Sequence, residues 1–197
     1  MVNPYFEGQE PHYLIQINNT GCGLLSKILQ TPPSVVTVRD AIKRYGQKEW
    51  DSFFTFTLVR NPYARAASLY GEYYYANKYK MLERDISFVN FLNLTLKHKK
   101  KPYYDKPRLF MSQWEWLVNF QGELGVDSIG RYEQFDIAVV CFLSMLNKDP
   151  FDYDRRPIRE ANPYRWERYY EGADGKIARG LIREYWADDF TNLNYKG

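Results

Sequence analysis

The sequence has little of what metal-binding, disulfide-stapled and membrane-spanning proteins require. Its 197 residues include two cysteines, Cys22 and Cys141, and two histidines, His12 and His98. Two isolated cysteines form neither a metal-ligand pattern nor a disulfide framework. No apolar run reaches the roughly 20 residues that cross a bilayer, and the N-terminus shows no basic segment followed by an apolar one. We therefore expect no bound metal, no membrane partner, and a soluble, cytoplasmic protein.

Excess charge of one sign is scarce as well. Lysine and arginine outnumber aspartate and glutamate by 27 to 24, giving a net charge of +3. This is too little to indicate nucleic acid, and no RNA-binding motif is present, so we expect no nucleic-acid partner. One local exception is the basic run Lys97–Lys101, with Lys106 and Arg108 nearby. It could hold an anionic acceptor such as a glycan, or it could be a solvated loop.

The chain is long enough for one domain and is rich in aromatic residues. With 45% hydrophobic residues it is not expected to be disordered, and 197 residues fit one domain, over 1–197, with its own core. Aromatic residues make up 18% of the chain, and 18 of them are tyrosines. Such a content suits either a polar, hydrogen-bonded cleft or dense aromatic packing.

The order of apolar runs and turn residues predicts an α/β fold: a single P-loop-like domain with a central parallel sheet flanked by helices and a helix-rich C-terminal half. Ser87 is expected to cap a helix, and 155–170 is polar and irregular. Strands are expected at 12–17, 53–59 and 127–133, and helices at 24–30, 37–50, 62–77, 88–98, 108–120, 134–147 and 175–190.

A glycine loop, Thr20-Gly21-Cys22-Gly23, lies between the first expected strand and helix. Backbone N–H groups at a helix N-terminus point toward a common spot, and the helix dipole favours an anion there. Glycines allow a phosphate to approach the backbone closely. A tight structural turn would explain the same glycines, and the loop alone does not separate the two interpretations.

A second constellation is the segment "LVRNPYARAASLY", residues 58–70. Arg60 stands at the carboxyl end of a predicted parallel strand, where open α/β sheets bind ligands. Ser68 follows two helical turns later, and Arg65 lies between them. A guanidinium fork and a hydroxyl suit a phosphate. The alternative is that Arg60 caps a carbonyl and Ser68 is an ordinary helix-face residue.

The segment "FFTFTLVRNPYARAASLY" resembles the 3′-phosphate-binding segment of the sulfotransferase superfamily, in the branch that includes carbohydrate and heparan-type sulfotransferases. The resemblance implies that Arg60 and Ser68 bind the 3′-phosphate of 3′-phosphoadenosine-5′-phosphosulfate (PAPS) or of its product, adenosine 3′,5′-bisphosphate (PAP). "IQINNTGCGLL" stands where the family has its 5′-phosphosulfate loop, which assigns Thr20, Gly21, Cys22 and Gly23 to cofactor binding.

Further segments extend the resemblance over about residues 13–195. "MSQWEWL" resembles the family's Gln-containing helix, "IGRYEQFD" its Gly-Arg-Phe/Tyr-Glu segment, and "IREYWADDFTNLNY" its terminal helix. The implied activity is transfer of a sulfuryl group from PAPS to a hydroxyl or amine acceptor, without a metal. In the family the Arg131-Tyr132-Glu133 region lies close to the nucleotide; a structural Arg–Glu pair is the alternative.

The loop departs from the family pattern, since Asn18, Asn19, Cys22 and Gly23 replace Pro, Lys, Gly and Thr. In the family the lysine, here Asn19, stabilises charge on the leaving nucleotide. Losing one such donor typically costs about 3 kcal/mol of barrier, roughly a hundredfold in rate. Lys27 or Arg65 could replace it, or Asn19 could suffice. The alternative is a catalytically impaired PAP/PAPS-binding protein of the same fold.

No general base can be assigned from the sequence. His12 is expected to be structural and His98 lies in a basic turn, while Glu72 and Glu115 are candidates only because their helices are expected to border the cleft. A kinase-like P-loop protein is a further alternative, but the glycines are not followed by Gly-Lys-Ser/Thr.

Overall fold

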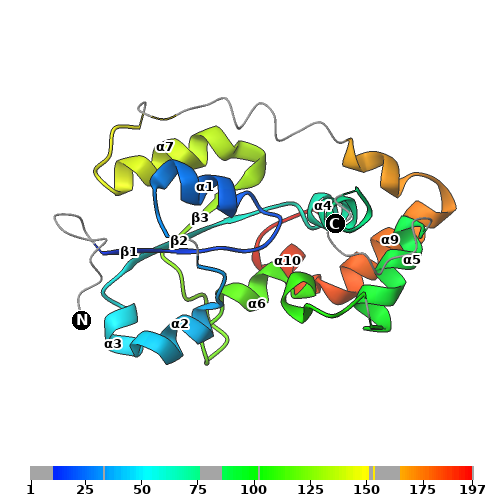
Figure 1. Ribbon diagram of the computed structural model, residues 1–197, viewed down its shortest axis with the longest axis horizontal. Coiled ribbons are helices and arrows are strands. Elements are labelled where there is room, and N and C mark those ends of the chain that lie inside the picture. The colour runs from blue at the N-terminus through cyan, green and yellow to red at the C-terminus, as the bar shows by residue number, and fades with distance from the viewer. Residues whose placement is uncertain are drawn as a thin grey trace. The chain divides into compact units, whose positions relative to one another are not determined.

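The computed structural model describes residues 11–32, 34–75, 86–101, 103–150, 153 and 165–196. The chain forms two compact units (Figure 1). The first comprises Met1–Val59 and Glu115–Asn162, and the second comprises Arg60–Trp114 and Pro163–Gly197. One domain over 1–197 stays a prediction.

A parallel sheet forms the centre of the first unit. Within the described residues it has three strands, β1 (His12–Ile15), β2 (Phe54–Val59) and β3 (Ser128–Arg131), and β2 lies in the middle. Ile15 pairs with Thr57, and Val59 pairs with Arg131. The predicted α/β class and parallel sheet are confirmed. Because all strands are parallel, the segments that follow β1, β2 and β3 all start at one edge of the sheet.

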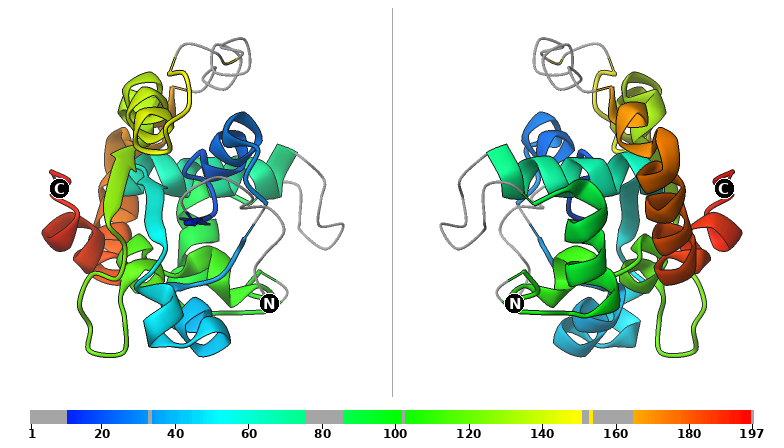
Figure 2. Two further views of the ribbon diagram at one scale, coloured as in Figure 1. Left: turned by 90° about the vertical axis from the view of Figure 1, so that its left-hand side faces the viewer. Right: turned by 90° about the vertical axis from the view of Figure 1, so that its right-hand side faces the viewer.

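Helices cover both faces of this sheet (Figures 1 and 2). On one face lie α1 (Cys22–Leu29) and α7 (Phe135–Met145), and on the other α2 (Val38–Tyr45) and α3 (Gln47–Trp50). Such double cover is what buries a parallel sheet and explains its continuous apolar runs. The α1–α7 face is packed by apolar side chains from strands and helices alike: Leu14, Cys22, Leu25, Leu29, Phe56, Leu58, Phe135, Ala138, Val139, Phe142, Leu143 and Leu146.

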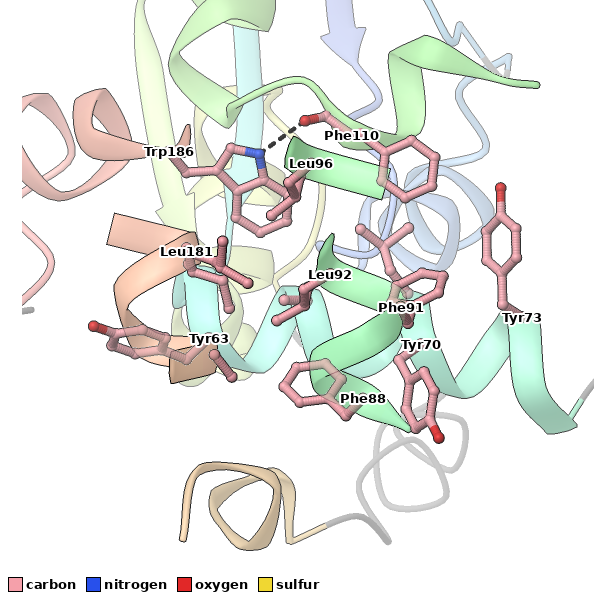
Figure 3. Close-up of a cluster of buried hydrophobic side chains, with 14 of the residues drawn as sticks. Tyr63, Tyr70, Tyr73, Phe88, Phe91, Leu92, Leu96, Phe110, Leu181 and Trp186 are labelled. Atoms are coloured by element: carbon pink, nitrogen blue, oxygen red, sulfur yellow. Dashed lines mark hydrogen bonds between the residues drawn. The ribbon is translucent and has the colours of Figure 1, made fainter. Parts of the chain in front are cut away.

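The second unit is helical and packs around an aromatic core (Figure 3). Its longest helices are α4 (Pro62–Tyr75) and α9 (Gly172–Tyr185). The shorter elements are α5 (Phe88–Leu92), the π-helical turn η2 (Asn93–Lys97), the 3₁₀ turns η3 (Pro107–Phe110) and η5 (Trp166–Tyr170), and α10 (Ala187–Asn192). Side chains from most of these elements meet in one cluster, so the tyrosines here serve packing. No helix of the described residues is both long and apolar enough to cross a bilayer.

Three expected helices are divided in the structure. The helix predicted for 37–50 divides into α2 and α3 at Gly46, which has a φ of 84°. The helix predicted for 108–120 divides into η3 and α6 (Gln113–Leu117), because Met111 adopts an extended conformation between them. The helix predicted for 175–190 breaks at Trp186, whose indole Nε1 donates to the Phe110 carbonyl at 2.8 Å. The Met111 carbonyl accepts from Arg65 at 2.8 Å, so a tertiary hydrogen bond lies beside the breaks at Met111 and Trp186 and overrides helix propensity there. The expected Ser87 cap is confirmed, since its side chain accepts from the Asn90 N–H, while residues 76–77 and 155–164 fall outside the described residues.

Candidate functional site

The glycine loop leads from β1 into the N-terminus of α1. Asn19 and Gly21 both adopt left-handed conformations, with φ of 64° and 87°. The Gly21 carbonyl accepts from the N–H groups of Leu24 and Leu25, so Gly21 is the N-cap residue. Among the described residues no side chain caps α1, and its first turn has no acidic residue. The first N–H groups of a helix have no intrahelical partner, so this end can accept an anion.

Two of the predicted loop residues point their side chains into the protein. The hydroxyl of Thr20 donates to the Ile17 carbonyl at 2.9 Å and lies 3.2 Å from the Cys22 sulfur. That sulfur lies 3.6 Å from the carbonyl oxygens of Ile15 and Leu58. Thr20 and Cys22 are both buried. Only their backbone N–H groups are therefore candidates for ligand binding.

The two glycines of the loop differ in what the fold requires of them. Gly21 has a positive φ, and a Cβ there would lie 2.6 Å from Cδ2 of Tyr132, so both backbone and packing require glycine. Gly23 is exposed, and a Cβ there would have no atom within 4 Å. Glycine inside a helix costs about 1 kcal/mol relative to alanine. The fold therefore gives no reason for glycine at position 23, and no side chain at this position covers the start of α1.

Arg60, the residue after β2, is held through its backbone by Gln113. Its N–H donates to Oε1 of Gln113 at 2.7 Å, and its carbonyl accepts from Nε2 at 2.8 Å. Nε2 also donates to Asp189 Oδ2 at 3.0 Å, while Oδ1 accepts from the Trp114 N–H at 2.8 Å. Gln113 and Asp189 are fully buried, and Arg60 is half-buried. The Arg60 backbone is therefore fixed by a polar network inside the second unit.

The residues after Arg60 start α4 in a defined way. The Asn61 side-chain oxygen accepts from the N–H groups of Tyr63 and Ala64, at 2.9 and 3.4 Å, and Pro62 is the first helical residue. This is the preferred chemistry of a helix N-terminus. Residues 62–67 are all buried, and Ser68 is the first α4 residue that is partly exposed. Ser68 is thus an ordinary helix residue in conformation, with its side chain not fully covered.

Arg65 is a buried structural residue. Its two terminal nitrogens donate to the carbonyls of Met111 and Leu109, at 2.8 and 3.2 Å, and its guanidinium lies 4.6 Å from the Trp186 ring centre. Burial raises the pKa of Asp189, and the Arg65 charge and the hydrogen bonds from Gln113 and Trp114 oppose that rise. Arg65 packs inward and its guanidinium is engaged there. It is a poor replacement for the loop lysine.

Lys27 and the four candidates for a general base differ in burial and in position. Lys27 is exposed in the last turn of α1, at the end opposite the glycine loop. His12 is buried at the amino end of β1, with its Nε2 3.4 Å from the Thr31 hydroxyl, which confirms a structural role. His98, Glu72 and Glu115 are exposed. Their positions identify none of them as a general base, and the described residues contain no cluster of His, Cys, Asp and Glu suited to a metal.

The segment after β3 packs against the glycine loop through the rings of Tyr132 and Phe135. Arg131 ends β3 opposite Val59, and the Tyr132 ring packs against Gly21. Glu133 is exposed, as are Lys97–Lys101 in the second unit. Tyr132 therefore lies next to the proposed 5′-phosphosulfate loop.

Three contributors were not identified individually from the sequence: Gln113, Asp189 and the packing of Tyr132 on Gly21. Gln113 and Asp189 lie in two segments, MSQWEWL and IREYWADDFTNLNY, that resemble sulfotransferases as whole segments. Buried polar residues give no periodic signal, so hydropathy could not find them. The link from Asp189 through Gln113 to Arg60 becomes visible only in three dimensions.

Comparison with family models, with curated proteins and with solved structures finds no match for this chain. The similarity to sulfotransferases therefore depends on the motifs. It supports a proposal and does not assign the chain to a family.

Proposed function

We propose that this chain is a sulfotransferase-type protein of P-loop-like fold that binds PAPS and PAP. The proposal depends on two elements that are suited to bind an anion: the N-terminus of α1 and Arg60. Among the residues that the structure describes, no side chain caps the N-terminus of α1, and its first turn has no acidic residue. The N–H and the carbonyl of Arg60 are both held by hydrogen bonds. Both elements follow parallel strands at their carboxyl ends, where ligands bind in α/β proteins.

In this proposal the two elements recognise different phosphates of one nucleotide. The backbone N–H groups of Thr20–Gly23 bind the 5′ side, helped by the helix dipole. The Arg60 guanidinium and the Ser68 hydroxyl bind the 3′-phosphate, the group that distinguishes PAP from AMP. Tyr132, beside the loop, offers an aromatic surface close to the 5′ side.

The reaction would be an in-line displacement at sulfur. The acceptor oxygen or nitrogen forms the new bond to sulfur while the bond from sulfur to the bridging phosphate oxygen breaks. PAP leaves with the electron pair, and the acceptor's proton passes to a base or to water. Positioning and charge stabilisation supply the catalysis, as in phosphoryl transfer. The acceptor is unidentified, and an anionic glycan would suit the exposed Lys97–Lys101 run.

A second candidate function, binding without efficient turnover, is favoured by Asn19. This residue has a φ of 64°, a conformation that asparagine tolerates better than most residues. The local backbone thus gives a structural reason for asparagine where the family has lysine. A sulfation assay with PAPS across varied acceptors separates the two functions. Turnover that disappears in Arg60→Ala would reject the binding-only version.

Calorimetry tests the shared part of both versions. Purified, folded protein is titrated with PAP and, separately, with AMP, which lacks the 3′-phosphate. We expect PAP to bind at least tenfold more tightly, because the Arg60 and Ser68 contacts are made only with PAP. Equal affinities would refute the proposal, and tight magnesium-dependent binding of ATP would favour kinase-like chemistry instead.

A further inference from the structure

The side chain of Gln113 pairs with the backbone of Arg60 as a neighbouring strand would. β2 ends at Val59, so the next backbone groups have left the sheet ladder. Gln113 supplies both missing partners, accepting from the Arg60 N–H and donating to the Arg60 carbonyl. A primary amide can do this because it carries a donor and an acceptor side by side.

Asp189 fixes the amide of Gln113. Nε2 has two N–H groups; one is used on Arg60 and the other on Asp189 Oδ2. A carboxylate accepts only, so it holds the nitrogen of the amide on its own side and the oxygen toward the Arg60 N–H. The Trp114 N–H holds the second carboxylate oxygen. The chain of contacts therefore runs from α10 through α6 to the backbone of Arg60.

From this network we infer that Gln113 and Asp189 are positioning residues that set nucleotide selectivity by fixing the backbone of Arg60, and with it the point from which the Arg60 side chain extends. The inference rests on the proposed role of Arg60 at the 3′-phosphate. Fixing the backbone of a binding residue in advance removes part of the ordering cost at binding. Both residues are fully buried, so they act through Arg60 and do not need to touch the ligand.

The test is the ratio of PAP to AMP affinity in Gln113→Met, measured by calorimetry on the full chain. Methionine has a similar length but neither donates nor accepts like an amide. We expect the Kd for PAP to rise about tenfold and the Kd for AMP to stay within twofold, because only PAP uses Arg60. Thr95→Val serves as the control, since it removes a buried hydroxyl from the same unit without touching Arg60.

The outcomes separate this inference from the proposed function. If the wild type binds PAP and AMP equally, the proposed function fails and the inference fails with it. If the wild type prefers PAP and Gln113→Met keeps the full preference, only the inference fails. A parallel loss of both affinities together with thermal stability, as in a merely structural role, also overturns it. If Gln113→Met does not fold, Asp189→Asn replaces it: a single side-chain oxygen cannot accept from both Gln113 Nε2 and the Trp114 N–H, so the hold on the Gln113 amide weakens and PAP affinity is expected to fall relative to AMP affinity. An unchanged ratio overturns the inference.

Discussion

Replacing each of the two glycines of the α1 loop by alanine should change the free energy of unfolding in opposite directions. At Gly23 a Cβ meets no atom within 4 Å, and the backbone φ is not positive. Alanine there removes unfolded-state freedom and improves helix propensity, so we expect a gain of about 0.5–1 kcal/mol. At Gly21 the φ of 87° costs alanine about 1–2 kcal/mol. The contact of 2.6 Å with Tyr132 Cδ2 adds the displacement of that ring, giving a loss of about 2–4 kcal/mol.

Thermal unfolding followed by circular dichroism measures both changes. For a chain of this size, 1 kcal/mol corresponds to about 2–4 °C in Tm. Gly23→Ala should therefore raise Tm by about 2 °C, and Gly21→Ala should lower it by at least about 4 °C. A loss of stability in Gly23→Ala, or no change in Gly21→Ala, would refute this account of the loop.

An acidic substitution at Gly23 separates stability from binding. Aspartate in the first turn interacts favourably with the helix dipole, so Gly23→Asp should be as stable as Gly23→Ala or more stable. The same carboxylate occupies the proposed anion site and should weaken PAP binding by about tenfold or more through like-charge repulsion. Calorimetry on both variants gives the comparison. Undiminished PAP binding in Gly23→Asp would exclude the N-terminus of α1 as the 5′-phosphate site.

Three other residues give further predictions. Arg60→Lys keeps the charge but loses the planar fork, so calorimetry should show most of the preference for PAP over AMP lost; an unchanged preference would contradict bidentate binding. Arg65→Met removes donors to two carbonyls and the charge near Asp189, and urea unfolding should show a loss of about 3 kcal/mol or more; a loss below about 1 kcal/mol would contradict its structural role. Burial raises the pKa of Asp189, so the folded protein takes up a proton there more readily than the unfolded chain. The contribution of Asp189 to stability is greatest at low pH and declines as pH rises from about 4 through the raised pKa. The wild type should therefore lose stability relative to Asp189→Asn over that range. A gain in stability relative to Asp189→Asn would contradict the direction of the pKa shift.

Strands and the first helices were predictable because their signals are local. The apolar runs at 12–17 and 53–59 correspond to β1 and β2, and the Asn61-Pro62 pair marks the start of α4. The parallel sheet followed from the alternation of strands and helices. In α7 the residues Ile137 and Met145 are apolar yet exposed, so the amphipathic period of this helix is weak.

The parts that sequence reasoning missed depend on distant contacts. The breaks at Met111 and Trp186 occur within runs that the sequence predicts as helix, and each lies beside a long-range hydrogen bond. In the candidate site, the inward direction of the Thr20 and Cys22 side chains follows from hydrogen bonds to the strands beneath them. The support of Arg60 by Gln113 joins positions 53 residues apart. No periodic pattern contains such information.

A crystal structure of the protein soaked with PAP would test the central claim most directly. The account predicts the 3′-phosphate within hydrogen-bonding distance of the Arg60 guanidinium and the Ser68 hydroxyl, and the 5′-phosphate at the N–H groups that begin α1. A nucleotide bound elsewhere, or Arg60 and Ser68 directed away from a common phosphate, would contradict it.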